Sequence, residues 1–252
     1  MGDDSVTTDV LGNIAFLTLN RPRVLNAMNQ QMRLALTQEL QLMNETPGVR
    51  VVVIQGIGRA FCAGQDQNES RVLDQAGASG RIQSYCALFD AMRHMTRPVI
   101  ARLHGFAVGA GLQVALLADL RIASEDLRAG LPELDIGSPC ITGSGILWPI
   151  AGEAVVRRLV LTGDLVSAPE AERIGLVHEV VPSDELDDRV GALAAKLAEK
   201  AEAPMRLTKE WLRLLTEEHF ARTVEHATNA HARNFSSGEM TRGAARFLAR
   251  KR

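Results

Sequence analysis

Two stretches decide the fold of this chain: Ala60-Phe61-Cys62-Ala63-Gly64-Gln65-Asp66 and Gly105-Phe106-Ala107-Val108-Gly109-Ala110-Gly111-Leu112-Gln113. Each follows a strand-like run and precedes sequence typical of a helix. Both contain many small residues, which let backbone N–H groups come close to a ligand. Two such N–H donors that meet on one carbonyl oxygen form an oxyanion hole. Together the two stretches predict chemistry on an acyl group.

Strand-like and helix-like segments alternate through the first 182 residues. The continuous apolar run Val51–Ile54 is typical of a strand in a parallel sheet that is covered on both faces. Such alternation implies right-handed crossovers and an α/β fold with a mostly parallel sheet. The predicted strands are 14–19, 51–54, 99–103, 121–123 and 177–181. The predicted helices are 32–43, 82–95, 112–117, 153–161 and 169–174, with a loop-rich stretch at 130–145.

From residue 183 onward the pattern is helical throughout. The predicted helices are 186–200, 205–216, 220–234 and 244–250. We therefore expect an α/β core over residues 1–182 and a helical region over residues 183–252, divided near Pro182-Ser183-Asp184. A helical tail of this size is expected to pack on the core or on a neighbouring subunit.

Composition excludes several other classes of protein. The 252-residue chain has 46% hydrophobic and 23% charged residues, a composition typical of a globular protein. Its net charge of −2 gives no positive electrostatic field that would attract nucleic acid or an anionic membrane. Three cysteines and six histidines show no metal-ligand spacing, so neither a disulfide framework nor a metal site is expected. The acidic start, Met1-Gly2-Asp3-Asp4, has no apolar segment, and a cytoplasmic location is predicted.

Other motifs that carry chemistry are absent from the sequence. Gly105, Gly109 and Gly111 do not have the G-x-G-x-x-G spacing of a dinucleotide site. Gly143-Ser144-Gly145 lacks the Lys-Ser/Thr of a phosphate-binding loop. Cys62 is a possible nucleophile, but a cysteine among small apolar residues more often belongs to the core. No nucleotide cofactor is predicted.

Five segments in order along the chain carry a resemblance to one family. They are Asn20-Arg21-Pro22 with Asn26-Ala27, Ala60–Asp66, His104–Gln113, Leu131-Pro132-Glu133 with Gly137, and Gly243–Lys251. They resemble the N-R-P-x-x-x-N-A, A-F-x-A-G-x-D, N-G-x-A-x-G-G-G-x-E, P-E-x-x-x-G and G-x-x-A-F-x-x-K-R motifs of the enoyl-CoA hydratase/isomerase (crotonase) family. The resemblance spans nearly the whole chain.

This resemblance implies a crotonase-like (ββα)n superhelix core with a C-terminal helical trimerisation region. It implies an acyl-CoA thioester as the substrate, so that coenzyme A is part of the substrate and no separate cofactor is expected. It also implies that the chain forms a homotrimer or a dimer of trimers. Carried over by position, the backbone N–H groups of Gln65 and Ala110 would hold the thioester oxygen. Arg23, Ala63 and Arg250 would contact CoA, and Arg250 could reach that of a neighbouring subunit.

The main departure from the family pattern lies in the catalytic pair. Hydratases of the family carry two glutamates, of which the second matches Glu133, whereas the first falls on Gln113. An amide cannot take up or deliver a proton at neutral pH. Because losing one acid–base group costs roughly 10²–10⁴-fold in rate, Glu133 acting alone favours isomerisation of 3-enoyl-CoA to 2-enoyl-CoA. Gln113 would orient a water molecule or the acyl chain.

Three alternatives stay open at this point. Hydration of 2-enoyl-CoA is the main rival, and hydrolysis of an acyl-CoA thioester, with Glu133 activating water, is another. A non-catalytic homologue that binds RNA or a partner protein would use the basic C-terminus, which includes Arg242, Arg246 and Arg252. The net charge and the lack of interleaved aromatic residues speak against nucleic acid as a partner.

Overall fold

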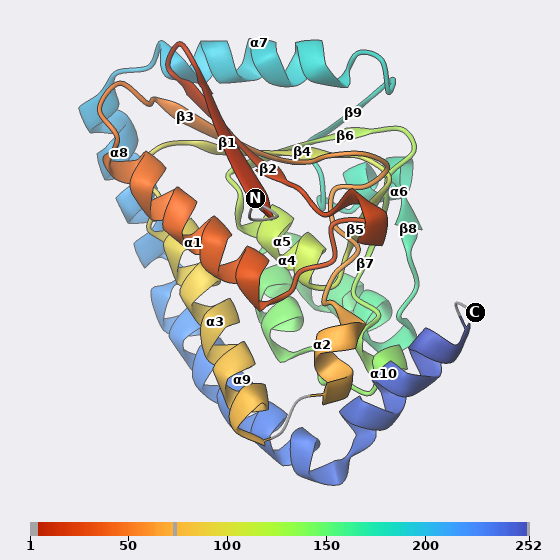
Figure 1. Ribbon diagram of the computed structural model, residues 1–252. Helices are drawn as coiled ribbons and strands as arrows, with labels where there is room; N and C mark the ends of the chain where they lie inside the picture. Colours follow the sequence, from red (N-terminus) through yellow and green to blue (C-terminus); the bar gives the residue numbers. More distant parts are fainter. Residues whose placement is uncertain (1–4, 73–74, 251–252) are drawn as a thin grey trace.

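A six-stranded sheet forms one layer of the molecule in the computed structural model, which describes residues 5–72 and 75–250 (Figure 1). The first two strands form an antiparallel hairpin, and all later pairs in this sheet are parallel. In spatial order the strands are β1 (Val6–Leu11), β2 (Ile14–Leu19), β3 (Val51–Gly56), β4 (Val99–Leu103), β6 (Leu120–Ser124) and β9 (Glu179–Val181).

The central strand β3 is covered on both faces, as its apolar run predicts. Side chains alternate across a strand, so Val51 and Val53 contact helix α7 (Leu186–Ala198), while Val52 and Ile54 belong to the main core on the other face. In Figure 1, α7 lies above the sheet and the other helices lie below it. The predicted division at residue 182 stays a prediction, although α7 packs directly on the sheet.

A second, three-stranded sheet carries the stretches that decide the fold. It consists of β5 (Phe106–Val108), β7 (Arg128–Gly130) and β8 (Val166–Ser167), in that order. A single bridge between Cys62 and Ala107 brings the first stretch against the second, although about 45 residues separate them in sequence. A second bridge, between Met28 and Gln65, holds the first stretch against the segment that follows the N-R-P motif.

The remaining helices surround the underside of the large sheet. Helix α9 packs along α3 and α5, and α10 returns to contact α2 and η2 at the lower end of the molecule (Figure 1). The helices are η1 (Pro22–Val24), α1 (Gln30–Glu45), α2 (Gln67–Val72), α3 (Gln75–Arg93), α4 (Ala110–Leu117), η2 (Glu133–Ile136), α5 (Ile141–Thr162), α6 (Ala168–Arg173), α8 (Glu202–Leu214), α9 (Glu217–Ser237) and α10 (Glu239–Arg250).

The structure contains strands and short helices that were not predicted: β1, β5, β7, β8, η1 and α2. Strand β1 pairs with β2 through a turn in which Gly12 has a φ of 62°. Residues 130–145 are more ordered than predicted, because they contain η2 and the first turn of α5. Gly145 allows that turn to pack against Thr223 of α9, where a Cβ atom would lie 2.3 Å from the threonine methyl group. Tertiary packing thus overrides the low helix propensity of the glycines.

Among the described residues, no helix combines the length and the apolar character needed to cross a membrane. Helix α8 has no buried residue, and it exposes several large apolar side chains along its length, together with Leu215 just beyond its end: Leu207, Trp211, Leu212, Leu214 and Leu215.

Candidate active site

Two glycines bring the two stretches into van der Waals contact. Gly64 and Gly109 both have positive φ angles, of 96° and 54°. A Cβ atom on Gly64 would lie 2.9 Å from the carbonyl oxygen of Val108, and one on Gly109 would lie 3.9 Å from the Cα of Gly64. The backbone conformation therefore favours glycine at both positions, and the close approach to Val108 also requires it at Gly64.

The two predicted oxyanion donors lie directly after these glycines. Ala110 is the first residue of α4, where backbone N–H groups have no partner within the helix and the helix dipole favours negative charge. Among the hydrogen bonds of the described residues, neither the N–H of Gln65 nor that of Ala110 has an acceptor. The two loops come so near that a Cβ atom on Gly64 would lie 3.8 Å from the backbone nitrogen of Ala110. Both Gln65 and Ala110 line the same cavity.

Glu133 lies over this pair of loops. It is the first residue of η2, and its Oε1 is 3.5 Å from where a Cβ atom on Gly109 would be. Gln113 donates a hydrogen bond from Nε2 to Glu133 Oε1 at 2.8 Å, and the Thr142 hydroxyl donates to Gln113 Oε1 at 2.7 Å. Glu133 Oε2 is buried and has no hydrogen-bond partner among the described residues. One carboxylate oxygen is therefore held by Gln113, and the other is buried next to Cys140.

The environment of Glu133 suits a proton carrier. Burial raises the pKa of its carboxyl group above the ordinary value, because the ionised form loses its hydration. The neighbouring Cys140 thiol and the Gln113 amide oppose part of that increase. Asp135, the other carboxylate of η2, is exposed and points at Gly163 instead. Glu133 is thus the carboxylate that reaches the two loops.

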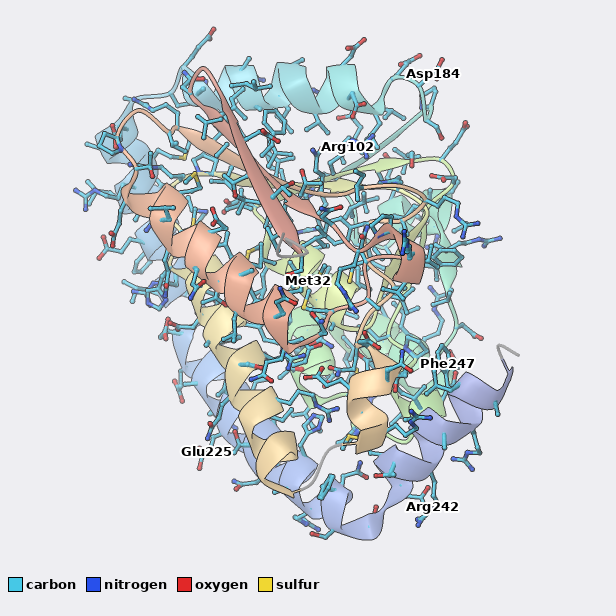
Figure 2. All side chains as sticks on the ribbon, viewed as in Figure 1. Met32, Arg102, Asp184, Glu225, Arg242 and Phe247 are labelled. Carbon is cyan, nitrogen blue, oxygen red and sulfur yellow. The ribbon has the colours of Figure 1, made fainter. Side chains whose placement is uncertain are left out.

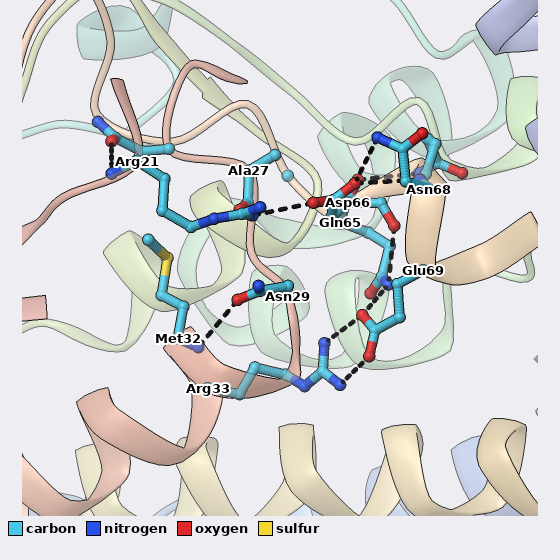
Figure 3. A network of polar contacts seen from close by, with 12 residues as sticks. Arg21, Ala27, Asn29, Met32, Arg33, Gln65, Asp66, Asn68 and Glu69 are labelled. Atoms are coloured by element: carbon cyan, nitrogen blue, oxygen red, sulfur yellow. Dashed lines mark hydrogen bonds and ion pairs between the residues drawn. The ribbon is translucent and has the colours of Figure 1, made fainter. Parts of the chain in front are cut away.

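The side chain of Gln65 is anchored in a polar network (Figure 3). It accepts a hydrogen bond from the Tyr85 hydroxyl at 2.7 Å and donates one to Glu69 at 2.9 Å. Glu69 in turn receives a two-pronged hydrogen bond from buried Arg33, at 2.8 and 2.9 Å. Arg21 pairs with Asp66 at 2.9 Å, so this arginine of the N-R-P motif fixes the loop. These contacts hold the backbone that carries the Gln65 N–H.

On one side, the loops open into a cleft that fits the predicted CoA contacts. Arg23 and Ala63 both line it, the former exposed and the latter half-buried. Arg59, which the motifs did not single out, adds a second cation, and Phe247 of α10 (Figure 2) closes one wall. Arg250 is the last residue of α10, and its side chain lies outside the described part of the chain.

On the other side, Glu133 and Ala110 face a second cavity beneath the loops. Gln113 and Gln65 also line it. Its remaining wall comes from α2, α3, α9, α10 and the segment between η2 and α5, with Ser70, Arg81, Tyr85, Ile82, His231, Met240, Ser138 and Pro139. Sequence reasoning missed this wall, because its residues come from distant helices and form no motif.

The structure assigns Cys62 to the core. Its side chain is fully buried, and its thiol donates to the carbonyl oxygen of Asn26 at 3.0 Å. Burial raises the pKa of Cys62 to about 12, which keeps it protonated and unreactive at neutral pH. Within the described ranges, no group of His, Cys, Asp or Glu side chains is arranged to hold a metal ion.

Comparison with known proteins agrees with this geometry. The sequence model of the family described as enoyl-CoA hydratase/isomerase matches residues 10–252. The chain is 35% identical to (E)-benzylidenesuccinyl-CoA hydratase of Thauera aromatica, over 81% of this chain and 80% of that protein. It is 30% identical to crotonyl-CoA hydratase of Syntrophomonas wolfei, over 100% and 98%. A solved enoyl-CoA hydratase/isomerase from Mycobacterium paratuberculosis superposes with a TM-score of 0.90 at 25% identity, covering 96% of this chain and 98% of that one.

The match to the family covers almost the entire chain, and the fold agrees with solved members from end to end. The predicted crotonase fold is therefore confirmed, as is the prediction of an enzyme. This chain belongs to the enoyl-CoA hydratase/isomerase family.

Proposed function

We propose that this enzyme moves the double bond of a 3-enoyl-CoA thioester to give the 2-enoyl-CoA thioester. The observation that carries the proposal is that Glu133 is the one carboxylate, among the described residues, that lines the cavity beneath the loops, with its Oε1 held by Gln113 at 2.8 Å. Because the neighbour that holds it is an amide, the described residues of this cavity offer no second carboxylate to share the proton transfer. Isomerisation needs only one.

In the proposed reaction, the Glu133 carboxylate removes a proton from C2 of the 3-enoyl group, and the electron pair of that C–H bond enters the conjugated system. The negative charge moves onto the thioester oxygen, where the N–H groups of Gln65 and Ala110 stabilise the dienolate. The protonated Glu133 returns the proton to C4, the double bond settles between C2 and C3, and the carboxylate is restored.

The Gln113 amide has a defined role in this scheme. Thr142 occupies its oxygen, so its nitrogen faces Glu133 and fixes the carboxylate orientation. This hydrogen bond lowers the pKa of Glu133 against the effect of burial, which helps keep the base ionised before it acts. Gln113 is therefore a positioning residue. Arg23, Ala63 and Arg59 are proposed to contact CoA from the adjoining cleft.

Hydration of 2-enoyl-CoA is the second candidate, because both relatives described above are named hydratases. In that reaction Glu133 would activate a water molecule held near Gln113. Those two names specify different acyl groups, so family membership leaves the acyl group of this enzyme open.

The two candidates are separated by assaying 3-hexenoyl-CoA and 2-hexenoyl-CoA with the same preparation. We expect kcat/KM for isomerisation to exceed that for hydration by at least about tenfold, given the cost of a missing acid–base group. Gln113→Glu should raise kcat/KM for hydration and so reduce the difference between the two reactions. Hydration as fast as isomerisation in the wild type would contradict the proposal in favour of the hydratase.

We also propose that the chain assembles into a homotrimer or a dimer of trimers, with α8 as a contact surface. The exposed Trp211 and Leu212 of α8 support self-association, since a row of large apolar side chains on one helix is costly to leave in water. Sedimentation equilibrium tests this: Trp211→Glu should shift the wild-type oligomer toward smaller species, and a monomeric wild type would refute it.

A further inference from the structure

The cavity beneath the loops, which Glu133 and Ala110 line and which we call the acyl cavity, has a buried arginine in its wall. Arg81 of α3 is only 5% exposed. Its Nη1 donates to the Ser70 hydroxyl at 3.0 Å, and its Nη2 contacts the thioether sulfur of Met240. Both partners are neutral, and a thioether sulfur is a weak acceptor. Arg81 lines the same cavity as Glu133 and Ala110.

A second buried arginine shows what is missing at Arg81. Arg33 is 1% exposed and forms a two-pronged ion pair with Glu69. Within residues 5–72 and 75–250, no side-chain carboxylate forms an ion pair with Arg81. Glu69 is near enough to favour the charge of Arg81, but both of its carboxylate oxygens are hydrogen-bonded to Arg33. An arginine does not lose its proton in proteins, and a buried charge without an ion pair of its own is costly. The cavity therefore holds a fixed positive charge that an anion would complement.

A buried histidine adds a further polar group to this wall. His231 of α9 lines the cavity, and its Nδ1 is buried without a hydrogen-bond partner among the described residues. Burial, with Arg81 nearby, lowers the pKa of His231 to about 4, so the ring is neutral at pH 7. A neutral imidazole can carry its proton on Nδ1 and donate it. Arg81, Ser70 and His231 together present donors suited to the two oxygens of a carboxylate.

The spacing of residues along α3 indicates how far Arg81 lies from the loops. Tyr85 contacts the Gln65 side chain, and Arg81 precedes Tyr85 by four residues, about 6 Å along the helix. Resting on the proposed function, we infer that the natural substrate is the monothioester of a dicarboxylic acid, whose free carboxylate binds Arg81 while the thioester occupies the loops. Arg81 is thus a specificity-determining residue.

The test compares two CoA thioesters that differ only at the far end. Hexanedioyl-CoA monothioester and hexanoyl-CoA are saturated, so calorimetry measures their binding without turnover. We expect the carboxylated compound to bind about 30- to 100-fold more tightly, the range for a hydrogen-bonded charge pair. Arg81→Met should abolish this preference, and Ser70→Ala should reduce it. Arg71→Met, which removes an exposed arginine from α2, is the matched charge control and should leave the preference intact.

Further arms keep the outcome interpretable. Thermal melting shows whether each variant folds. If Arg81→Met does not fold, the test uses Arg81→Lys and His231→Phe instead. Both are expected to weaken the preference for the carboxylated thioester. Asp74 precedes α3 outside the described residues, and Asp74→Asn should leave the preference unchanged. Equal wild-type binding of the two thioesters, or a preference that appears only in Asp74→Asn, would overturn the inference.

Measurements of turnover test the carboxylate site separately from the proposed isomerisation. We expect 3-hexenedioyl-CoA monothioester to be isomerised with a higher kcat/KM than 3-hexenoyl-CoA. A binding preference that depends on Arg81, with neither compound turned over, would contradict the proposed reaction and leave the carboxylate site standing. Turnover of both compounds with equal kcat/KM and equal binding would contradict the carboxylate site alone.

Discussion

The two ends of the acyl cavity are built in different ways. At the thioester end, backbone groups from two short stretches converge because Gly64 and Gly109 permit it, and one carboxylate, Glu133, lies above them. At the far end, the wall consists of side chains from four helices, including Ser70, Arg81 and His231. The first end is defined by main-chain geometry and the second by the packing of distant elements.

This difference separates reaction from selectivity. Changes at the thioester end should lower the rate for every acyl group, since they act on the proton and on the dienolate. Changes at the far end should alter the preference among acyl groups. The following predictions test that separation, from the largest expected effect to the smallest.

Glu133→Gln should have the largest effect. It keeps the shape of the side chain but removes the one carboxylate that, among the described residues, lines the cavity beneath the loops, so we expect kcat to fall by about 10⁴-fold for all acyl groups with little change in thioester binding. Steady-state kinetics and calorimetry measure the two quantities. Asp135→Asn on the same helical turn, exposed and directed at Gly163, is the control and should be fully active. Substantial activity in Glu133→Gln would refute the assignment.

Gly109→Ala should lower kcat by about 10²–10³-fold, the range for losing an oxyanion donor. An L-residue is strained on a backbone with φ of 54° and ψ of −123°, so the loop that carries the Ala110 N–H should shift, while the new methyl group would be in contact with Glu133 Oε1 at 3.5 Å. Gly12→Ala provides the matched control, because Gly12 also has a positive φ but has open space around it in the β1–β2 turn. If both variants lose the same stability and only Gly109→Ala loses activity, the effect belongs to the site.

The pH dependence of kcat/KM should reveal the buried base. Glu133 must be ionised to accept a proton, and its pKa is raised by burial. Activity should therefore fall, as the pH decreases, at a higher pH than an ordinary glutamate would give. Gln113→Ala removes a hydrogen bond that lowers this pKa and should move the acidic limb to still higher pH. A limb that does not move in Gln113→Ala would contradict the positioning role of Gln113.

The smallest effect concerns stability. A group with a raised pKa in the folded state favours the fold when protonated, and that contribution is lost as the pH rises through the folded-state pKa. At pH 7, above the pKa of an unfolded glutamate, the raised pKa of Glu133 therefore costs stability, and Glu133→Gln should raise Tm by about 1–4 °C. The difference should vanish below the pKa of unfolded glutamate, near pH 4. Scanning calorimetry at both pH values checks this, and a lower Tm at pH 7 would contradict it.

The same contrast explains what the sequence could predict. The buried strand β3 and the two loops follow from local patterns, because a glycine at positive φ or an apolar run is visible within a few residues. Glu133 follows from the resemblance of its segment to a family motif. Strands as short as β8 have too few residues for any period to be seen. The cluster of Ser70, Arg81 and His231 has no sequence pattern at all, since only the packing of α2, α3 and α9 brings it together.

The central claim is that one sheltered carboxylate carries the proton from C2 to C4. It is tested most directly by giving the wild-type enzyme a 3-enoyl-CoA thioester that carries deuterium at C2, in ordinary water, and by locating the label in the first product by NMR. Because Glu133 Oε2 is buried, we expect a measurable share of the deuterium at C4. A product whose new hydrogen at C4 comes entirely from solvent, from the earliest turnovers onward, would contradict the account.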